Sequence, residues 1–190
     1  PFIFNDVVTT LHFVKADGDR TDSDDTVGML FNWHSHPEVL AADNPYISSD
    51  FPHYVREYLE NGFETETEVI GETDVTRPAW DGLGGPVVYI SGTVGGLLNP
   101  LSTPAKDRAG NVYDSANFAK ADALGQRLAD ATFEVLATEC VDDEVWNCTR
   151  KLDDTTLRFA QQELFLPVEN RQFQAAAITL DLFRRDVYNW

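Results

Sequence analysis

The run Val-Val-Tyr-Ile-Ser at residues 87–91 is the stretch that decides the fold class. Its apolar side chains follow one another without alternation, which is typical of a strand covered on both faces of a sheet. A glycine-containing segment follows at residues 92–96, and glycines allow a backbone to turn sharply and to approach other groups closely. The run therefore predicts a central strand that leads into a tight loop.

Two further strands are expected upstream, because residues 7–15 and 26–33 are rich in β-branched and aromatic side chains. The polar segment between them, residues 16–25, carries five aspartates and predicts the tip of a hairpin. Calcium binding by these carboxylates is the alternative to a solvated turn. The tip lacks the glycine and the glutamate that an EF-hand loop places at its sixth and twelfth positions.

Helices are expected where apolar residues recur at helical spacing, at residues 50–61 and 115–139. The candidate caps are Ser48, Ser49 and Asp50 for the first helix, and Asp114 or Ser115 for the second. Between them, residues 60–76 carry six acidic side chains and predict an exposed excursion.

A strand at residues 157–168 and a helix at residues 173–187 are expected near the end of the chain. Strands and helices thus alternate along the sequence. This order predicts an α/β fold, a layered mixed sheet with flanking helices, in a single domain that covers residues 1–190.

The formal charge of −18 over 190 residues restricts the partners. Such a surface repels nucleic acids and anionic membranes. No apolar run approaches the roughly 18 residues that a transmembrane helix needs. The excess of acid is typical of a secreted or salt-adapted soluble protein, and calcium capture is the alternative.

The two cysteines, Cys140 and Cys148, have a spacing that matches no common zinc or redox motif. A short-loop disulfide is the preferred interpretation, and two buried free thiols are the alternative. A disulfide would imply an oxidising compartment, so the protein is expected to be secreted, periplasmic or on the cell surface.

His34 and His36 lie at the end of the strand expected at residues 26–33. Residues two apart on a strand point to the same face, and neutral imidazole is a good zinc ligand. A metal site is therefore one interpretation. The other is a polar strand end whose histidines bond nearby carbonyls. Pro37 ends strand pairing and places His36 at the start of a loop, where binding and catalytic residues tend to occur.

Four segments in this order resemble the central part of the neutral/alkaline non-lysosomal ceramidase family. They are Leu-Phe-Asn-Trp-His-Ser-His-Pro-Glu at residues 30–38, Ile-Ser-Ser-Asp-Phe-Pro-His-Tyr at 47–54, Val-Val-Tyr-Ile-Ser-Gly-Thr-Val-Gly-Gly at 87–96, and Asn-Pro at 99–100. The family has a strand that ends in His-Pro, a Ser-x-Asp helix start, and a strand that runs into a glycine-containing loop. The resemblance covers residues 7–100 and continues weakly beyond them.

The resemblance implies a zinc-dependent hydrolase of an amide (N-acyl) or related bond, with a small-molecule or lipid-like substrate. The histidine of the His-Pro motif falls on His36, which becomes the expected zinc ligand, with His34 as a second ligand or polar neighbour. The other ligands of the family lie upstream of the His-Pro strand or beyond this chain, so the chain is expected to be the middle part of the catalytic domain. The residues expected to support the ligands or line the pocket are Asn32, Asp50, Gly92, Gly95 and Gly96.

One departure from the family bears on the substrate, because the serine that ceramidases tie to amide hydrolysis falls on Leu98 or nearby and is absent. The substrate is therefore left open. The rival hypothesis is a non-catalytic, acidic extracellular scaffold or assembly protein that kept the fold. Self-assembly into a homo-oligomer is compatible with either hypothesis.

Overall fold

The computed structural model describes residues 7–42, 44–92, 100–141, 147–152, 172 and 179. The chain divides into two compact units, Pro1–Arg150 and Lys151–Trp190. All helices and strands named below belong to the first unit. The strand expected at residues 157–168 and the helix expected at 173–187 lie outside the described residues, and the single domain stays a prediction.

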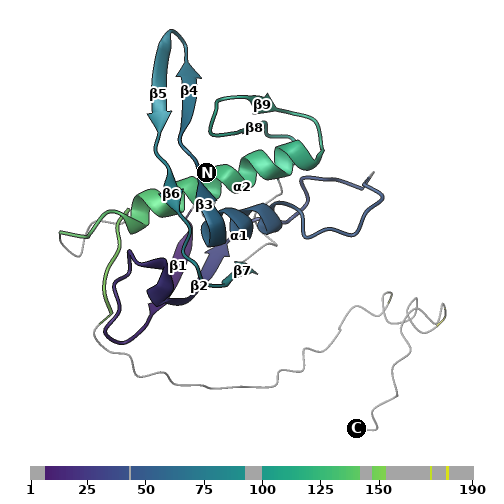
Figure 1. Ribbon diagram of the computed structural model, residues 1–190. Helices are drawn as coiled ribbons and strands as arrows, with labels where there is room; N and C mark the ends of the chain where they lie inside the picture. Colours follow the sequence, from purple (N-terminus) through teal and green to yellow (C-terminus); the bar gives the residue numbers. More distant parts are fainter. Residues whose placement is uncertain are drawn as a thin grey trace. The chain divides into compact units, whose positions relative to one another are not determined.

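A three-stranded mixed sheet forms the centre of the first unit, in the order β1-β2-β7 (Figure 1). Strand β1 (Thr9–Val14) pairs antiparallel with β2 (Thr26–Trp33), and β2 pairs parallel with β7 (Val87–Ser91). The expected hairpin and the expected strand at residues 87–91 are thus confirmed. A 3₁₀ turn, η1 (Ser23–Asp25), lies between β1 and β2.

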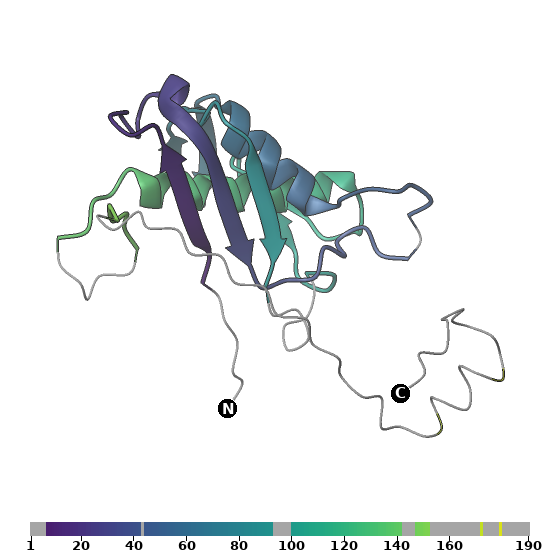
Figure 2. The ribbon, with the colours of Figure 1, turned by 90° about the horizontal axis from the view of Figure 1, so that it is seen from below.

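Two helices cover one face of this sheet (Figure 2). Helix α1 (Phe51–Asn61) lies in the crossover between the parallel strands β2 and β7, and α2 (Phe118–Leu136) packs along α1. The two helices approach closely at Gly125, where an added Cβ would overlap the side chain of Tyr54. A mixed α/β arrangement with flanking helices is therefore present, as the sequence predicted.

The hydrophobic core lies between the sheet and the helices. It is lined by alternate residues of the strands and by one stripe of each helix: Met29, Phe31, Val87, Phe51, Val55, Leu59, Ala121, Ala129 and Phe133. Within the sheet, the ring of Phe31 stacks on Tyr89 at 5.3 Å between centroids. Between the layers, Phe51 of α1 meets Tyr89 edge-on at 5.9 Å.

The opposite face of the sheet is open among the described residues. Leu11, Leu30 and Val88 lie side by side across the three strands, and Leu11 and Val88 are 44% and 52% exposed. Ile90 on the same face is 42% exposed. Residues 87–91 were expected to be covered on both faces, but within the described residues only the helix-facing side is covered.

Short strands form the rest of the first unit. They are β3 (Gly62–Phe63), β4 (Glu66–Ile70), β5 (Thr73–Arg77), β6 (Trp80–Asp81), β8 (Ala105–Lys106) and β9 (Val112–Tyr113). Strands β4 and β5 form a projecting hairpin (Figure 1), where an exposed acidic excursion was expected. That expectation is wrong for Glu68, which is only 1% exposed.

Three cations explain how Glu68 can be buried. Its carboxylate accepts hydrogen bonds from Arg77 on β5 and from Arg127 on α2, at 2.8 and 2.7 Å, and pairs with Lys106 on β8 at 2.8 Å. A buried charge is tolerated only when it is paired and hydrogen-bonded in this way. The sequence pattern showed only an acidic run, because these partners are distant in the chain.

The helix caps agree with the sequence for α1 and differ for α2. Asp50, one of the three candidates, caps α1 by accepting from the Phe51 N–H. The cap of α2 is Asn117, whose side chain accepts from the Lys120 N–H at 2.9 Å. Asp114 and Ser115 lie before this residue, so the helix begins at Phe118 rather than at residue 115.

Candidate functional site

The ends of the parallel strands bring together His34, an expected ligand or polar neighbour, and two expected supporting residues, Asn32 and Gly92. The Gly92 N–H donates to the Trp33 carbonyl at 3.0 Å, so strands β2 and β7 end side by side. The His34 ring lies against Gly92 so closely that a Cβ there would overlap its Nδ1. The Asn32 amide donates to the Ile90 carbonyl at 3.3 Å. Asn32, His34 and Gly92 thus share the carboxyl ends of two parallel strands.

His36 lies beyond the strand, which ends at Trp33. The spacing argument that placed His34 and His36 on one strand face therefore does not apply. The His36 side chain is 35% exposed, and its Nδ1 lies 3.7 Å from the Oε1 of Glu38. Ser35, between the two histidines, is buried.

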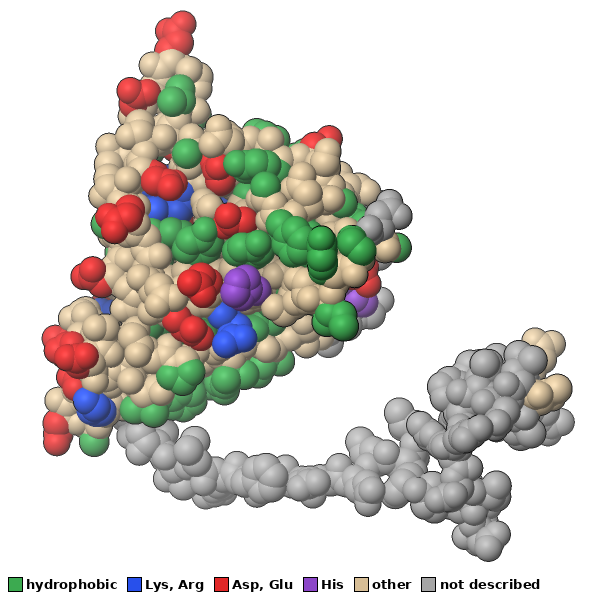
Figure 3. All heavy atoms as spheres, turned by 45° about the vertical axis from the view of Figure 1, so that its right-hand side comes forward, with side chains coloured by type: hydrophobic (Ala, Val, Ile, Leu, Met, Phe, Trp, Pro, Cys, Tyr) green, Lys and Arg blue, Asp and Glu red, His purple; other side chains and the backbone are tan. Residues whose placement is uncertain are grey.

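A cleft of about 510 Å³ opens next to His36 in the chain. Its walls come from the segment between β2 and α1 and from the turn before β8: Pro37, Glu38, Leu40, Ala41, Ala42, Asn44, Tyr46, Ser48, Asp50 and Leu101. Two of these side chains are acidic and none is basic, so the cleft shares the negative charge of the chain. Figure 3 likewise shows acidic side chains scattered over one face of the molecule.

Asp50 is buried at the base of α1 and its carboxylate is held by backbone groups. It accepts from the Phe51 N–H at 2.7 Å and from the Leu40 N–H at 2.9 Å, while its own N–H donates to the Ser48 hydroxyl at 2.9 Å. Asp50 therefore fastens the cleft segment to the helix. Asp50 thus caps the helix and also lines the cleft.

Backbone strain gathers in the same cleft. Ala41 and Asp50 have φ angles of 56° and 59°, and among the described residues no other non-glycine residue has a positive φ. Such conformations cost of order 1–3 kcal/mol and tend to cluster at functional sites, where the surrounding structure enforces them. Both residues line the cleft.

His36 is a suitable ligand by chemistry, but within the described ranges no group of three or more His, Cys, Asp and Glu side chains is placed to hold a metal. A catalytic zinc needs three protein ligands. Gly95 and Gly96 lie outside the described residues, and so does Leu98.

The acidic tip between β1 and β2 uses its carboxylates to hold the turn. Asp19 accepts from the Thr21 N–H and hydroxyl at 2.9 and 2.7 Å, and Asp25 accepts from the Asp19 N–H at 3.0 Å. These bonds suit the solvated-turn interpretation. Calcium binding there stays a prediction of the sequence.

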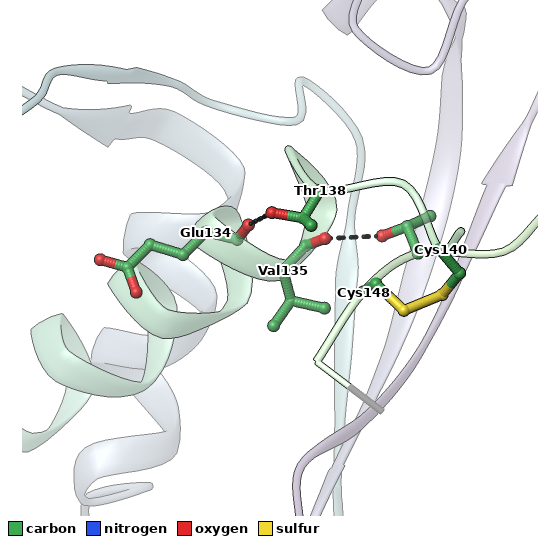
Figure 4. The surroundings of a disulfide bond; sticks show 6 residues. Glu134, Val135, Thr138, Cys140 and Cys148 are labelled. Atoms are coloured by element: carbon green, nitrogen blue, oxygen red, sulfur yellow. Dashed lines mark hydrogen bonds between the residues drawn. A yellow bond between two sulfur atoms is a disulfide. The ribbon is translucent and has the colours of Figure 1, made fainter. Parts of the chain in front are cut away.

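The disulfide between Cys140 and Cys148 is confirmed (Figure 4). It lies at the C-terminal end of α2, where the Thr149 hydroxyl donates to the Val135 carbonyl at 2.9 Å and the Thr138 hydroxyl to the Glu134 carbonyl at 3.0 Å. The bridge thus holds a segment that caps the last turn of α2.

Among the described residues, none of the helices is long and apolar enough to cross a membrane.

Sequence reasoning missed Glu38 and Ala41. Glu38 directly follows the His-Pro pair, and this adjacency is the signal that points to it. Ala41 has no such signal, since its strain shows only in the backbone.

No family model, curated protein or solved structure matches the chain.

Proposed function

We propose that this chain forms part of a zinc-dependent hydrolase of the ceramidase type, acting on an amide (N-acyl) or related bond. The proposal starts from the resemblance of residues 30–38, 47–54 and 87–100, and includes a ceramidase-like fold. His36 is the proposed ligand. His34 is either a second ligand or a polar neighbour held by Gly92, and the remaining ligands come from residues outside the described ranges.

The observation that carries the proposal is the position of the cleft. In α/β sheets, ligands bind outside the carboxyl ends of parallel strands. The β2-α1-β7 unit puts His34 and Gly92 at this edge, and His36 and the strained cleft follow directly in the chain. The lining of the cleft begins at Pro37, the residue after His36, and includes neither His34 nor His36. Strain and a cleft that starts one residue after a metal-ligand type of side chain support a site of chemistry in this segment.

The roles of the chain's own residues follow from their contacts. Asn32 ties the ends of β2 and β7 together, and Asp50 fixes the cleft segment through two backbone N–H groups. A bound zinc ion would supply Lewis-acid activation of a carbonyl and of water.

The disulfide supports a secreted, periplasmic or cell-surface location, because such bonds persist in oxidising compartments.

Hydrolysis of N-acyl compounds tests the proposal. The purified intact polypeptide is incubated with a panel of N-acyl and ester substrates, alongside His36→Ala and the control His53→Ala, whose ring is exposed on α1. We expect hydrolysis that is lost in His36→Ala and retained in His53→Ala. Hydrolysis that is unchanged in His36→Ala would refute the role of His36.

A non-catalytic assembly protein is the second candidate, and the open sheet face favours it. Leu11, Val88 and Ile90 form an apolar surface among the described residues, and such surfaces mark interaction sites. Light scattering of the wild type and of Val88→Thr distinguishes the candidates. A stable oligomer that dissociates in Val88→Thr, without hydrolysis of any substrate, would favour assembly over catalysis.

A further inference from the structure

The segment His36-Pro37-Glu38 folds back on itself. The Glu38 N–H donates to the His36 carbonyl at 2.9 Å, which closes a three-residue turn. Pro37 has its φ fixed by its ring, so the turn has little freedom. The two side chains on either side of the proline are thereby brought together, and the Oε1 of Glu38 lies 3.7 Å from the Nδ1 of His36.

This contact has little value for stability. The two side chains are 35% and 51% exposed, and exposed ion pairs contribute only about 0–1 kcal/mol. The fold of the segment is held instead by the backbone turn and by Asp50, which binds the Leu40 N–H.

The contact does have a consequence for the imidazole. Neutral histidine carries its proton on one ring nitrogen and accepts through the other. A carboxylate beside Nδ1 favours the proton there and leaves the lone pair on Nε2. Histidines that bind metals almost always donate a hydrogen bond from their second nitrogen to a carboxylate, carbonyl or water. At 3.7 Å, Glu38 acts on the imidazole through its charge.

The other polar groups near this turn are already engaged. The Asp50 carboxylate is bound to two backbone N–H groups, and the His34 ring lies against Gly92. The Nε2 of His36 has no hydrogen-bond partner within the described ranges. Glu38 is also part of the cleft wall, so it connects the imidazole with the cleft.

We propose that Glu38 is the positioning residue of His36: it keeps the proton on Nδ1 and presents Nε2 as the binding nitrogen. The identity of what Nε2 binds, a zinc ion, rests on the proposed function. The positioning itself rests only on the turn and on the contact between the two side chains. Glu38 is not assigned a catalytic role, because it acts through the imidazole.

Nitrogen-15 NMR of the intact polypeptide tests this directly. Long-range proton–nitrogen correlations report which ring nitrogen of His36 carries the proton at a pH where the imidazole is neutral. The metal-free wild type is compared with Glu38→Ala, with Glu38→Gln, and with the control Glu57→Ala on the exposed side of α1. Each variant is then titrated with zinc, and binding is measured by calorimetry.

We expect the Nδ1–H form in the wild type and in Glu57→Ala, and a shift towards Nε2–H in Glu38→Ala. Glu38→Gln should be intermediate, because its amide oxygen carries a partial negative charge at the same place but no full charge. Zinc affinity should fall about 10–100-fold in Glu38→Ala, as for other residues that hold metal ligands.

An Nε2–H form in the wild type, or a form that Glu38→Ala leaves unchanged, would overturn the proposal. A form that depends on Glu38 in a protein that takes up no zinc would support the positioning role and refute the zinc function. The two ideas therefore fail separately.

Discussion

The ring of His34 lies directly against the α-carbon of Gly92, where the parallel strands β2 and β7 both end. The two residues are far apart in the sequence, and a side chain at position 92 would occupy the space of the imidazole. This contact is the clearest link between the His-Pro segment and the glycine-containing segment that follows residues 87–91. It also explains why the second segment begins with a glycine.

Gly92→Ala should displace the His34 ring. The added Cβ would overlap Nδ1, Cε1 and Cγ of the ring, and overpacking of this kind typically costs about 1–3 kcal/mol. Chemical denaturation should show a loss of that size, and the His34 ring resonances should move. The control is Gly71→Ala, where nothing lies within 4 Å of the new Cβ; it should leave those resonances in place. Unmoved His34 resonances in Gly92→Ala would contradict the contact.

Ala41→Gly should stabilise the cleft segment or leave its stability unchanged. Ala41 has a φ of 56°, a conformation that costs an L-residue roughly 1–2 kcal/mol and glycine very little. The neighbouring Ala42 has no positive φ, so Ala42→Gly only adds unfolded-state entropy and should destabilise by about 0.5–1 kcal/mol. The melting temperatures of the two variants should therefore differ. A larger loss in Ala41→Gly than in Ala42→Gly would show that the strain is absent.

Glu68→Gln should destabilise the first unit by about 3 kcal/mol, because it leaves three cations beside a neutral buried amide. The control is Glu72→Gln, between β4 and β5, where the side chain is exposed; it should change the free energy of unfolding by less than about 0.5 kcal/mol. Urea unfolding of both variants measures the difference. Equal effects would mean that the Glu68 contacts carry no net stability.

The same glutamate predicts a dependence on pH. Burial by itself would raise the pKa of Glu68, but hydrogen bonds from Lys106, Arg127 and Arg77 outweigh it and hold the pKa at about 2. Because this pKa is below the unfolded value, the stabilisation is complete above about pH 4.5 and is lost as the pH falls towards 2. Urea unfolding between pH 6 and pH 2 should show this loss in the wild type and a smaller loss in Glu68→Gln.

Reduction of the Cys140–Cys148 disulfide should lower the melting temperature. A loop of this length contributes about 2–3 kcal/mol by restricting the unfolded chain, and the bridge also holds Thr149 against the last turn of α2. Thermal unfolding with and without a thiol reductant measures the effect. The variant with both cysteines changed to serine should melt at the lower temperature with or without the reductant. An unchanged wild-type melting temperature after complete reduction would contradict this role.

Local patterns predicted the parts of the fold that depend on neighbouring residues. The strands at residues 26–33 and 87–91, the helix capped by Asp50 and the disulfide are all present. Each depends on side-chain spacing, capping or a short loop, which one segment contains by itself. The chain order of two strands, a helix and a third strand also predicted the mixed sheet with flanking helices.

Contacts between distant segments were not predictable in the same way. The burial of Glu68 depends on Arg77, Lys106 and Arg127, which come together only in the folded chain. The cleft depends on the backbone of Ala41 and on the turn at Leu101, for which no residue pattern gives a signal. Within the site, His34 and Gly92 are in contact, whereas β2 ends at Trp33, so the strand geometry expected for His34 and His36 is absent.

The zinc content of the intact polypeptide is the most direct test of the proposed hydrolase. The protein is purified without chelators, dialysed, and analysed by mass spectrometry of its metals together with His36→Ala and the control His53→Ala. The proposal predicts about one zinc per wild-type and His53→Ala chain, and loss of zinc in His36→Ala. Absence of zinc from the wild type, or equal zinc in His36→Ala, would contradict it.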